Sequence, residues 1–172
     1  MTIAKITDAI RNWLNDEVCP SIQLKQSYDY NQFEFVLVNP VAYSGYAPAI
    51  TEDAKRIPHI VVMPASGEDM EDSGVIHYFL DIVLWNPGLH VNSDVKSEPQ
   101  EGWRDLTNIV DRLRRALGNA RILKNRVKVG HPIKYMVYTS QDLLPDSDYY
   151  RGNIEFDVTF FIERNTIYSD LI

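Results

Sequence analysis

The side chains that could bind a metal or attack a substrate are four histidines and one cysteine. His59, His77, His90 and His131 never fall in a metal-ligand spacing with one another or with Cys19. Two acidic residues shortly before Cys19 raise rather than lower a thiol pKa, so we expect a packed and inert cysteine. The sequence has no Gly-x-Ser-x-Gly segment and no phosphate-binding glycine motif. We therefore expect no enzyme activity, no metal ion and no cofactor.

An acidic cluster, Glu68, Asp69, Glu71 and Asp72, lies between two glycines. Calcium prefers several carboxylate oxygens from one loop, but this segment lacks the spaced ligands and the central glycine of an EF-hand. We therefore expect the solvated tip of a β-hairpin.

The strongest electrostatic feature is a basic segment, residues 112–128, which holds seven of the 17 lysines and arginines and none of the 24 acidic residues. It stands out because the whole chain has a formal net charge of −7. One interpretation is a solvated surface whose lysines pair with Glu155 and Asp157 across a sheet. The other is an electrostatic docking surface that complements the acidic cluster. Its candidate contact residues are Arg112, Arg115, Lys124, Arg126 and Lys128.

The spacing of apolar residues predicts two amphipathic helices, at 3–14 and 103–117. Alternating apolar and polar residues predict strands, and the irregular segments 41–58 and 86–102 are expected to be long loops. Pro64 is expected to end the second strand. The predicted strands are 33–38, 59–63, 75–85, 121–129, 133–137 and 153–163.

Strands that are apolar on one side favour an antiparallel sheet, and two amphipathic helices can cover its apolar face. We therefore expect an α+β fold: one two-layer domain over residues 1–172, with a mainly antiparallel β-sheet and two helices packed on one face. The helix stripe Trp103, Leu106, Val110, Leu113 and Leu117 is predicted to pack on the sheet face that carries Ile154, Phe156, Val158 and Phe160.

A length of 172 residues suits one domain that buries about 70 % of the surface of the extended chain. No segment approaches the roughly 20 apolar residues of a membrane span, and no signal peptide is evident. We expect a protein made in the cytoplasm, with its one cysteine reduced.

The order of these elements resembles the tail terminator (tail completion) proteins of long-tailed bacteriophages, within the wider group of small phage neck and tail-completion proteins. The resemblance covers about residues 3–162. It rests on the N-terminal helix 3–14, the strand 75–85 that leads into Asn86-Pro87, a helix with Gly102-Trp103-Arg104-Asp105-Leu106 and Val110-Asp111-Arg112-Leu113, and Tyr149-Tyr150-Arg151-Gly152 opening the final strand.

The resemblance implies a structural virion protein that forms a ring, typically a hexamer, which caps the tail tube and offers its other face to the head connector. Its partners would be further copies of itself, the tail tube protein and the head-connector or neck proteins. DNA would pass through the ring lumen without sequence-specific binding. Three alternatives stay open: another neck or head-completion protein, a small enzyme or accessory nucleic-acid-binding protein that uses the basic segment 112–128 on phosphates, and a homodimeric α+β binding module with a ligand in its sheet.

Overall fold

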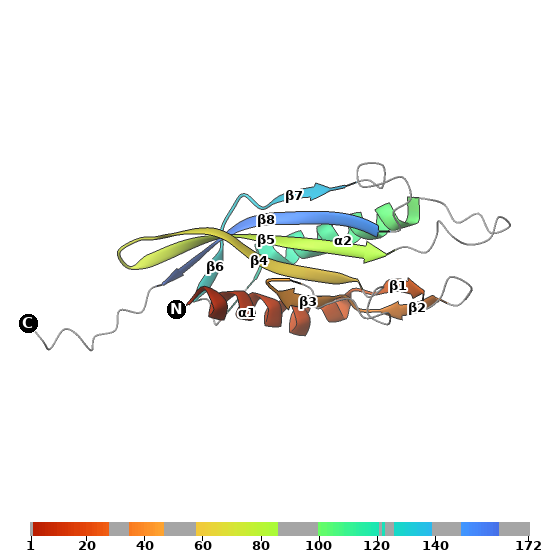
Figure 1. Cartoon of the computed structure of the whole chain (residues 1–172), viewed down its shortest axis with the longest axis horizontal. Helices are drawn as coiled ribbons and strands as arrows, with labels where there is room; N and C mark the ends of the chain where they lie inside the picture. Colours follow the sequence, from red (N-terminus) through yellow and green to blue (C-terminus); the bar gives the residue numbers. More distant parts are fainter. Residues whose placement is uncertain are drawn as a thin grey trace, which may run out of the picture.

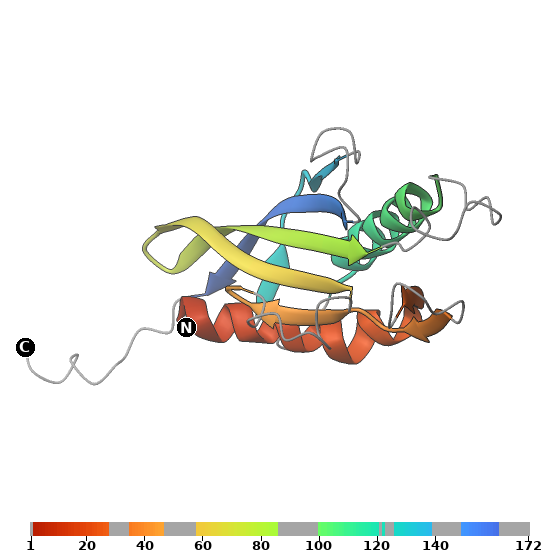
Figure 2. The same cartoon turned by 45° about the vertical axis from the view of Figure 1, so that its right-hand side comes forward.

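The described residues fold into a mixed α/β structure with a curled β-sheet and two α-helices (Figures 1 and 2). The computed structural model describes residues 2–27, 35–46, 58–85, 100–120, 122, 126–138 and 149–161. The helices are α1 (Ile3–Trp13) and α2 (Gln100–Gly118), and α1 continues as a π-helical turn, η1 (Leu14–Val18), and a 3₁₀ turn, η2 (Cys19–Ser21). The strands are β1 (Leu24–Ser27), β2 (Phe35–Val38), β3 (Val41–Ser44), β4 (His59–Asp69), β5 (Ser73–Trp85), β6 (Val127–Val129), β7 (Lys134–Val137) and β8 (Tyr149–Phe161).

The main sheet has the strand order β3-β4-β5-β8-β6, and β7 also pairs with β8. Strands β6 and β7 lie one after the other along the same edge of β8, because β6 pairs with residues 158–160 and β7 with residues 152–155. Every pairing in this sheet is antiparallel except that of β3 with β4. Strands β1 and β2 form a separate antiparallel pair.

The alternation predicted for the two longest strands is confirmed, and it defines the inner face of the sheet. In β8 the residues of the predicted apolar face are buried, and they lie in register with the buried even-numbered residues of β5. The inner-face residues are Ile76, Tyr78, Leu80, Ile82 and Leu84 of β5, and Ile154, Phe156, Val158 and Phe160 of β8. We call the opposite side of the sheet the outer face.

Helix α2 packs against β8 through Leu106, Val110, Leu113 and Leu117, which are all buried. The prediction that Trp103 belongs to this stripe is wrong, because its side chain is 46 % exposed. The buried position in the first turn of α2 is Gly102 instead, where a side chain would collide with the ring of Tyr150. Gly152 likewise lets the helix come close, because a Cβ there would lie 3.3 Å from Leu106 and 3.5 Å from Val110.

Thr2 caps the N-terminus of helix α1, because its hydroxyl accepts a hydrogen bond from the amide of Lys5 at 3.3 Å. The buried side chains of α1 include Ile6, Ile10 and Trp13, as the spacing predicts, but Ile3, the first residue of the predicted stripe, is 53 % exposed. The α-helix ends at Trp13, and the predicted last residue, Leu14, is buried in the π-helical turn that follows. This first helix packs against β3 and β4.

The predicted loop 41–58 is wrong at its start, because Val41–Ser44 form strand β3, which pairs in parallel with β4. A four-residue strand with only Ala42 buried offers no alternation to recognise. The second predicted loop, 86–102, is wrong at its end, because residues 100–102 form the start of α2. Residues 47–57 of the first predicted loop and residues 86–99 of the second lie outside the described residues.

Pro64 does not end β4, which continues to Asp69 after a register shift between Pro64 and Ser66. The amide of Gly45 donates to the carbonyl of Val62 at 2.9 Å, so even-numbered residues of this part of β4 direct their backbone groups away from β5. The nitrogen of Pro64, which cannot donate a hydrogen bond, therefore points away from β5. No hydrogen bond between β4 and β5 is lost at this residue.

The predicted strand 121–129 is shorter than expected, since its described part forms only β6 and an isolated bridge between Ile122 and Val127. Arg121 and residues 123–125 lie outside the described residues. The predicted strands 33–38, 133–137 and 153–163 are confirmed in their described parts as β2, β7 and β8, of which β7 begins one residue later and β8 four residues earlier than predicted. Residues 33, 34, 162 and 163 lie outside the described residues.

Candidate interaction surfaces

The acidic cluster lies at the end of the β4–β5 hairpin, which projects from one end of the molecule (Figures 1 and 2). Glu68 and Asp69 end β4, whereas Glu71 and Asp72 lie in the turn, and all four are exposed. The turn is therefore shorter than the expected acidic loop. The pairing of Glu68 with Val75 and of Asp69 with Gly74 places Glu68 on the outer face and Asp69 on the inner face.

The structure does not gather the predicted basic residues on one surface. Arg112 of α2 donates to the carbonyl of Ser21 in η2 at 2.6 Å, and Arg115 lies 3.7 Å from Asp111 one helical turn away. Lys128 is exposed on β6 opposite Thr159, which is an outer-face position. Arg126 is exposed just before β6, and Lys124 lies outside the described residues.

The carboxylates predicted to pair with lysines lie instead beside His77 of β5. Nδ1 of His77 is 2.8 Å from a carboxylate oxygen of Asp157, and Nε2 is 3.9 Å from Glu155. The ring of His77 also stands edge-on to Phe79, with centroids 5.0 Å apart. The three polar groups, His77, Glu155 and Asp157, come from β5 and β8. All three occupy odd-numbered positions of the predicted strands, so the predicted alternation was enough to place them on one face.

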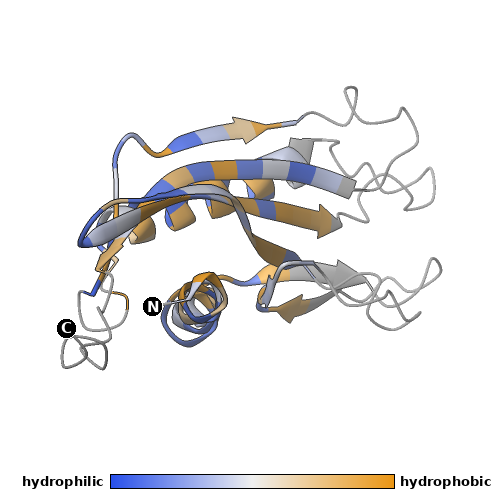
Figure 3. Cartoon of the chain, turned by 60° about the vertical axis from the view of Figure 1, so that its left-hand side comes forward, coloured by the Kyte–Doolittle hydropathy of each residue, from blue (hydrophilic) through white to orange (hydrophobic). Residues whose placement is uncertain are grey.

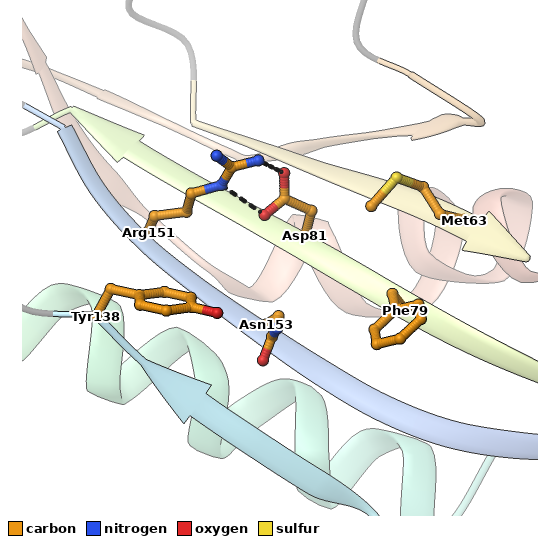
Figure 4. A pocket seen from close by; sticks show the side chains of 6 residues that line it. All are labelled: Met63, Phe79, Asp81, Tyr138, Arg151 and Asn153. Atoms are coloured by element: carbon orange, nitrogen blue, oxygen red, sulfur yellow. Dashed lines mark hydrogen bonds and ion pairs between the residues drawn. The ribbon is translucent and has the colours of Figure 1, made fainter. Parts of the chain in front are cut away.

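A shallow pocket on the outer face is arranged around an ion pair between β5 and β8 (Figure 4). Arg151 donates through Nε to one carboxylate oxygen of Asp81 at 2.9 Å and through a terminal nitrogen to the other at 2.6 Å. The carboxylate beside it raises the pKa of the Arg151 guanidinium. The lining residues are Met63, Phe79, Asp81, Tyr138, Arg151 and Asn153.

Sequence reasoning missed this pair, although both residues occupy odd positions of the two clearest strands. Opposite charges on the same face of adjacent strands indicate such a pair, but they identify its two members only once the register between the strands is known. The guanidinium is about half exposed, so the ion pair contributes little to stability. Its effect is to orient the two side chains on the outer face.

Cys19 is buried in η2, and burial raises its thiol pKa from 9.0 to about 11. The thiol is therefore protonated at neutral pH, which makes it a poor nucleophile and a poor metal ligand. Within the described residues, no three histidine, cysteine, aspartate or glutamate side chains are grouped so that they could hold a metal ion.

No family model matches the chain, and no curated protein matches its sequence. Neither of the described helices is long and apolar enough to cross a membrane.

Proposed function

We propose that the chain is a structural virion protein of a long-tailed bacteriophage or phage-like particle, forming a ring that caps the tail tube and joins it to the head connector. The observation that supports it best is the separation of opposite charges onto different elements. The acidic hairpin tip projects from one end of the molecule (Figure 1), and the exposed Arg112 and Arg115 lie on α2.

A head-to-tail ring requires two unlike surfaces on each subunit, whereas a twofold dimer presents one surface to itself. An acidic tip repels its own copy in a twofold contact, and it attracts a surface of opposite charge on a neighbour. The charge distribution therefore favours a ring over a symmetric dimer, and the resemblance to tail terminator proteins implies that the ring is a hexamer.

In this proposal, α1 and α2 form one layer on the inner face of the sheet, as expected for a two-layer domain. The hydrogen bond between Thr7 of α1 and Tyr78 of β5, and the approach of α2 to Gly152 of β8, support this arrangement. The outer face, with its ion pairs and its pocket, is then free for the tail tube protein, the head connector or the lumen through which DNA passes. The role involves no catalysis and no cofactor.

Deletion of the gene in the phage or prophage that carries it tests the proposal. Filled heads and unjoined tails of irregular length are expected by electron microscopy, and the chain supplied from a plasmid should restore joined particles. Unjoined tails of normal length would favour the alternative of another neck protein. Normal joined particles without the gene would contradict any role in the virion.

A further inference from the structure

Within the described residues, four edges of the main sheet have no further strand added: the outer edge of β7, at one border of the sheet (Figure 3), the edge of β4 beyond the end of β3, and the outer edges of β3 and β6. Strand edges with unpaired amide and carbonyl groups are sites where another chain can add a strand. The hydrogen-bond pattern identifies which residues present these groups.

In β7, the amide of Tyr138 donates to the carbonyl of Arg151 on β8 at 2.9 Å. Backbone groups alternate in direction along an antiparallel strand, so Lys134 and Met136 also direct theirs toward β8. Those of Tyr135 and Val137 point away from the sheet. Within the described residues, these outward groups form no hydrogen bond.

In β4, the amide of Met70 donates to the carbonyl of Ser73 on β5 at 2.7 Å. By the same alternation, Ser66 and Glu68 direct their backbone groups toward β5. Gly67 and Asp69 direct theirs outward, past the end of β3, and across the described parts of the chain these groups have no hydrogen-bond partner.

The outer edge of β6 is only three residues long, and the amide of Val127 there donates to the carbonyl of Ile122 at 3.4 Å. The edge of β3 is blocked by a side chain. The amide nitrogen of Asn15 donates to the carbonyl of Ala42 at 3.0 Å, and its oxygen accepts from the amide of Ala42 at 2.8 Å. One side-chain amide thus replaces one residue of a neighbouring strand. The open edges of β4 and β7 therefore lie on opposite sides of the same sheet.

The strand directions of these two edges fit each other. Strands β4, β5, β8 and β7 alternate in direction, so β7 runs opposite to β4. When a second copy is placed beside the first in a similar orientation, its β7 meets β4 of the first copy antiparallel. The alternation of the sheet then continues across the contact.

We propose that the end of β4 in one copy pairs with β7 of the next copy, with Gly67 opposite Tyr135, Glu68 opposite Lys134 and Ser66 opposite Met136. This contact would join the sheets of successive subunits head to tail. It rests on the proposed function for the closure of the ring, and it specifies which surfaces of the subunits meet there.

Several registers place the outward-directed backbone groups of β4 opposite those of β7. The charges of the exposed side chains select one of these registers. Glu68 and Lys134 are both exposed outer-face residues, and they face each other only in this register. Within the described residues Lys134 forms no ion pair, since Glu155 beside it on β8 lies against His77. A lysine on an edge strand opposes most strand additions, but an acidic strand offsets that charge.

In this register Gly67 lies opposite Tyr135, and a residue without a side chain suits that position. The ring of Tyr135 lies 4.7 Å from the guanidinium of Arg114 on α2. A glycine at position 67 of the incoming strand leaves the ring in that place. Pairing two β4 edges would instead bring two acidic tips together.

The test is a chain with the substitutions Ser66→Cys and Met136→Cys. In the proposed register these residues form a pair without backbone hydrogen bonds, where Cβ atoms lie closest, at about 4.5–5.5 Å. The two sites of one chain are at least three strand spacings apart, about 14 Å, so they cannot form a disulfide within it. Cys19 is buried and remains protonated, so it does not compete.

Mild oxidation should give a ladder of disulfide-linked species of increasing copy number, which reducing agent removes. The matched control carries Ser66→Cys and Lys134→Cys, so its cysteine on β7 is moved by two residues. Its yield of disulfide-linked species should be several-fold lower than that of the first pair. Adding Glu68→Lys to the first pair should lower the yield about two- to fivefold, and a further Lys134→Glu should restore it.

The absence of linked species, a dimer that does not extend, or an equal yield from the shifted control would each overturn the edge pairing. A gene deletion that leaves particles normal would instead contradict the virion role, whatever the ladder shows. The two failures are therefore distinguishable.

Discussion

The hydroxyl of Tyr78 lies 2.9 Å from the hydroxyl of Thr7, and this buried hydrogen bond links β5 to α1. Thr7 donates its own hydrogen to the carbonyl of Ile3 at 2.9 Å, so Tyr78 is the donor to Thr7. The contact satisfies a phenol group that is completely buried in the core.

Thr7→Val should therefore destabilise the protein more than Tyr78→Phe. The first leaves a buried phenol without an acceptor, at a cost of about 1–3 kcal/mol, whereas the second loses one hydrogen bond, about 0.5–1.5 kcal/mol. The double variant should cost less than the sum, because neither polar group then remains. Urea denaturation of the four proteins measures this, and additive losses would show that the two hydroxyls do not interact.

Leu113→Ala should lower the free energy of unfolding by about 2–5 kcal/mol, because Leu113 is fully buried between α2 and the sheet. Trp103→Ala, on the same helix, is the matched control and should cost less than about 1 kcal/mol, since Trp103 is largely exposed. Equal losses for the two variants would contradict the position of α2 described above.

Stability should fall at alkaline pH through Cys19. The unfolded thiol ionises near its ordinary pKa of 9.0 and the folded thiol near a pKa of about 11. The stabilisation is therefore fully present below pH 9 and is lost as the pH rises toward 11, by about 1–3 kcal/mol. Burial also raises the pKa of Tyr78, which acts in the same direction at higher pH.

Thermal melting of the natural chain and of Cys19→Ala between pH 8 and pH 10 measures the thiol's share. The variant should show a flatter decline with pH, whatever its stability at neutral pH. Parallel curves would mean that Cys19 ionises in the folded chain as it does in the unfolded one.

Asn15→Ala should cost about 1–3 kcal/mol, because it removes two hydrogen bonds and leaves backbone groups of Ala42 without partners. It also opens the edge of β3, so aggregation on heating should increase. Asn12→Ala is the control on the same helical segment, since Asn12 is exposed, and it should change stability by less than about 0.5 kcal/mol. Light scattering during the melt separates the two effects, and matching curves would show that Asn15 does not protect the edge.

The inner face of the sheet could be predicted because its strands are long. Eleven or more residues of alternation in β5 and β8 leave no doubt about which side chains are buried. Helix α2 was recognisable for the same reason, but its first turn was not. A glycine at the buried position carries no apolar signal, so the neighbouring Trp103 took its place in the pattern.

The candidate surfaces were less predictable, because they depend on which strands become neighbours. The sequence indicated an acidic hairpin tip, and the structure has one at the predicted residues. The basic segment runs through a helix end and a short strand, and these elements direct Arg112 and Lys128 to different parts of the surface. The partners of His77 and Asp81 were unpredictable until the register between β5 and β8 was known.

The register shift between Pro64 and Ser66 changes which residues of β4 belong to the inner face. Before it, even-numbered residues such as Val62 belong to the inner face, and after it odd-numbered residues such as Asp69 do. Loss of the extra residue between Pro64 and Ser66 would let the two follow each other in ordinary alternation, and Glu68 would stay opposite Val75 on the outer face. The bulge therefore absorbs a change of length in β4, so the acidic end of the molecule keeps its orientation with or without that residue.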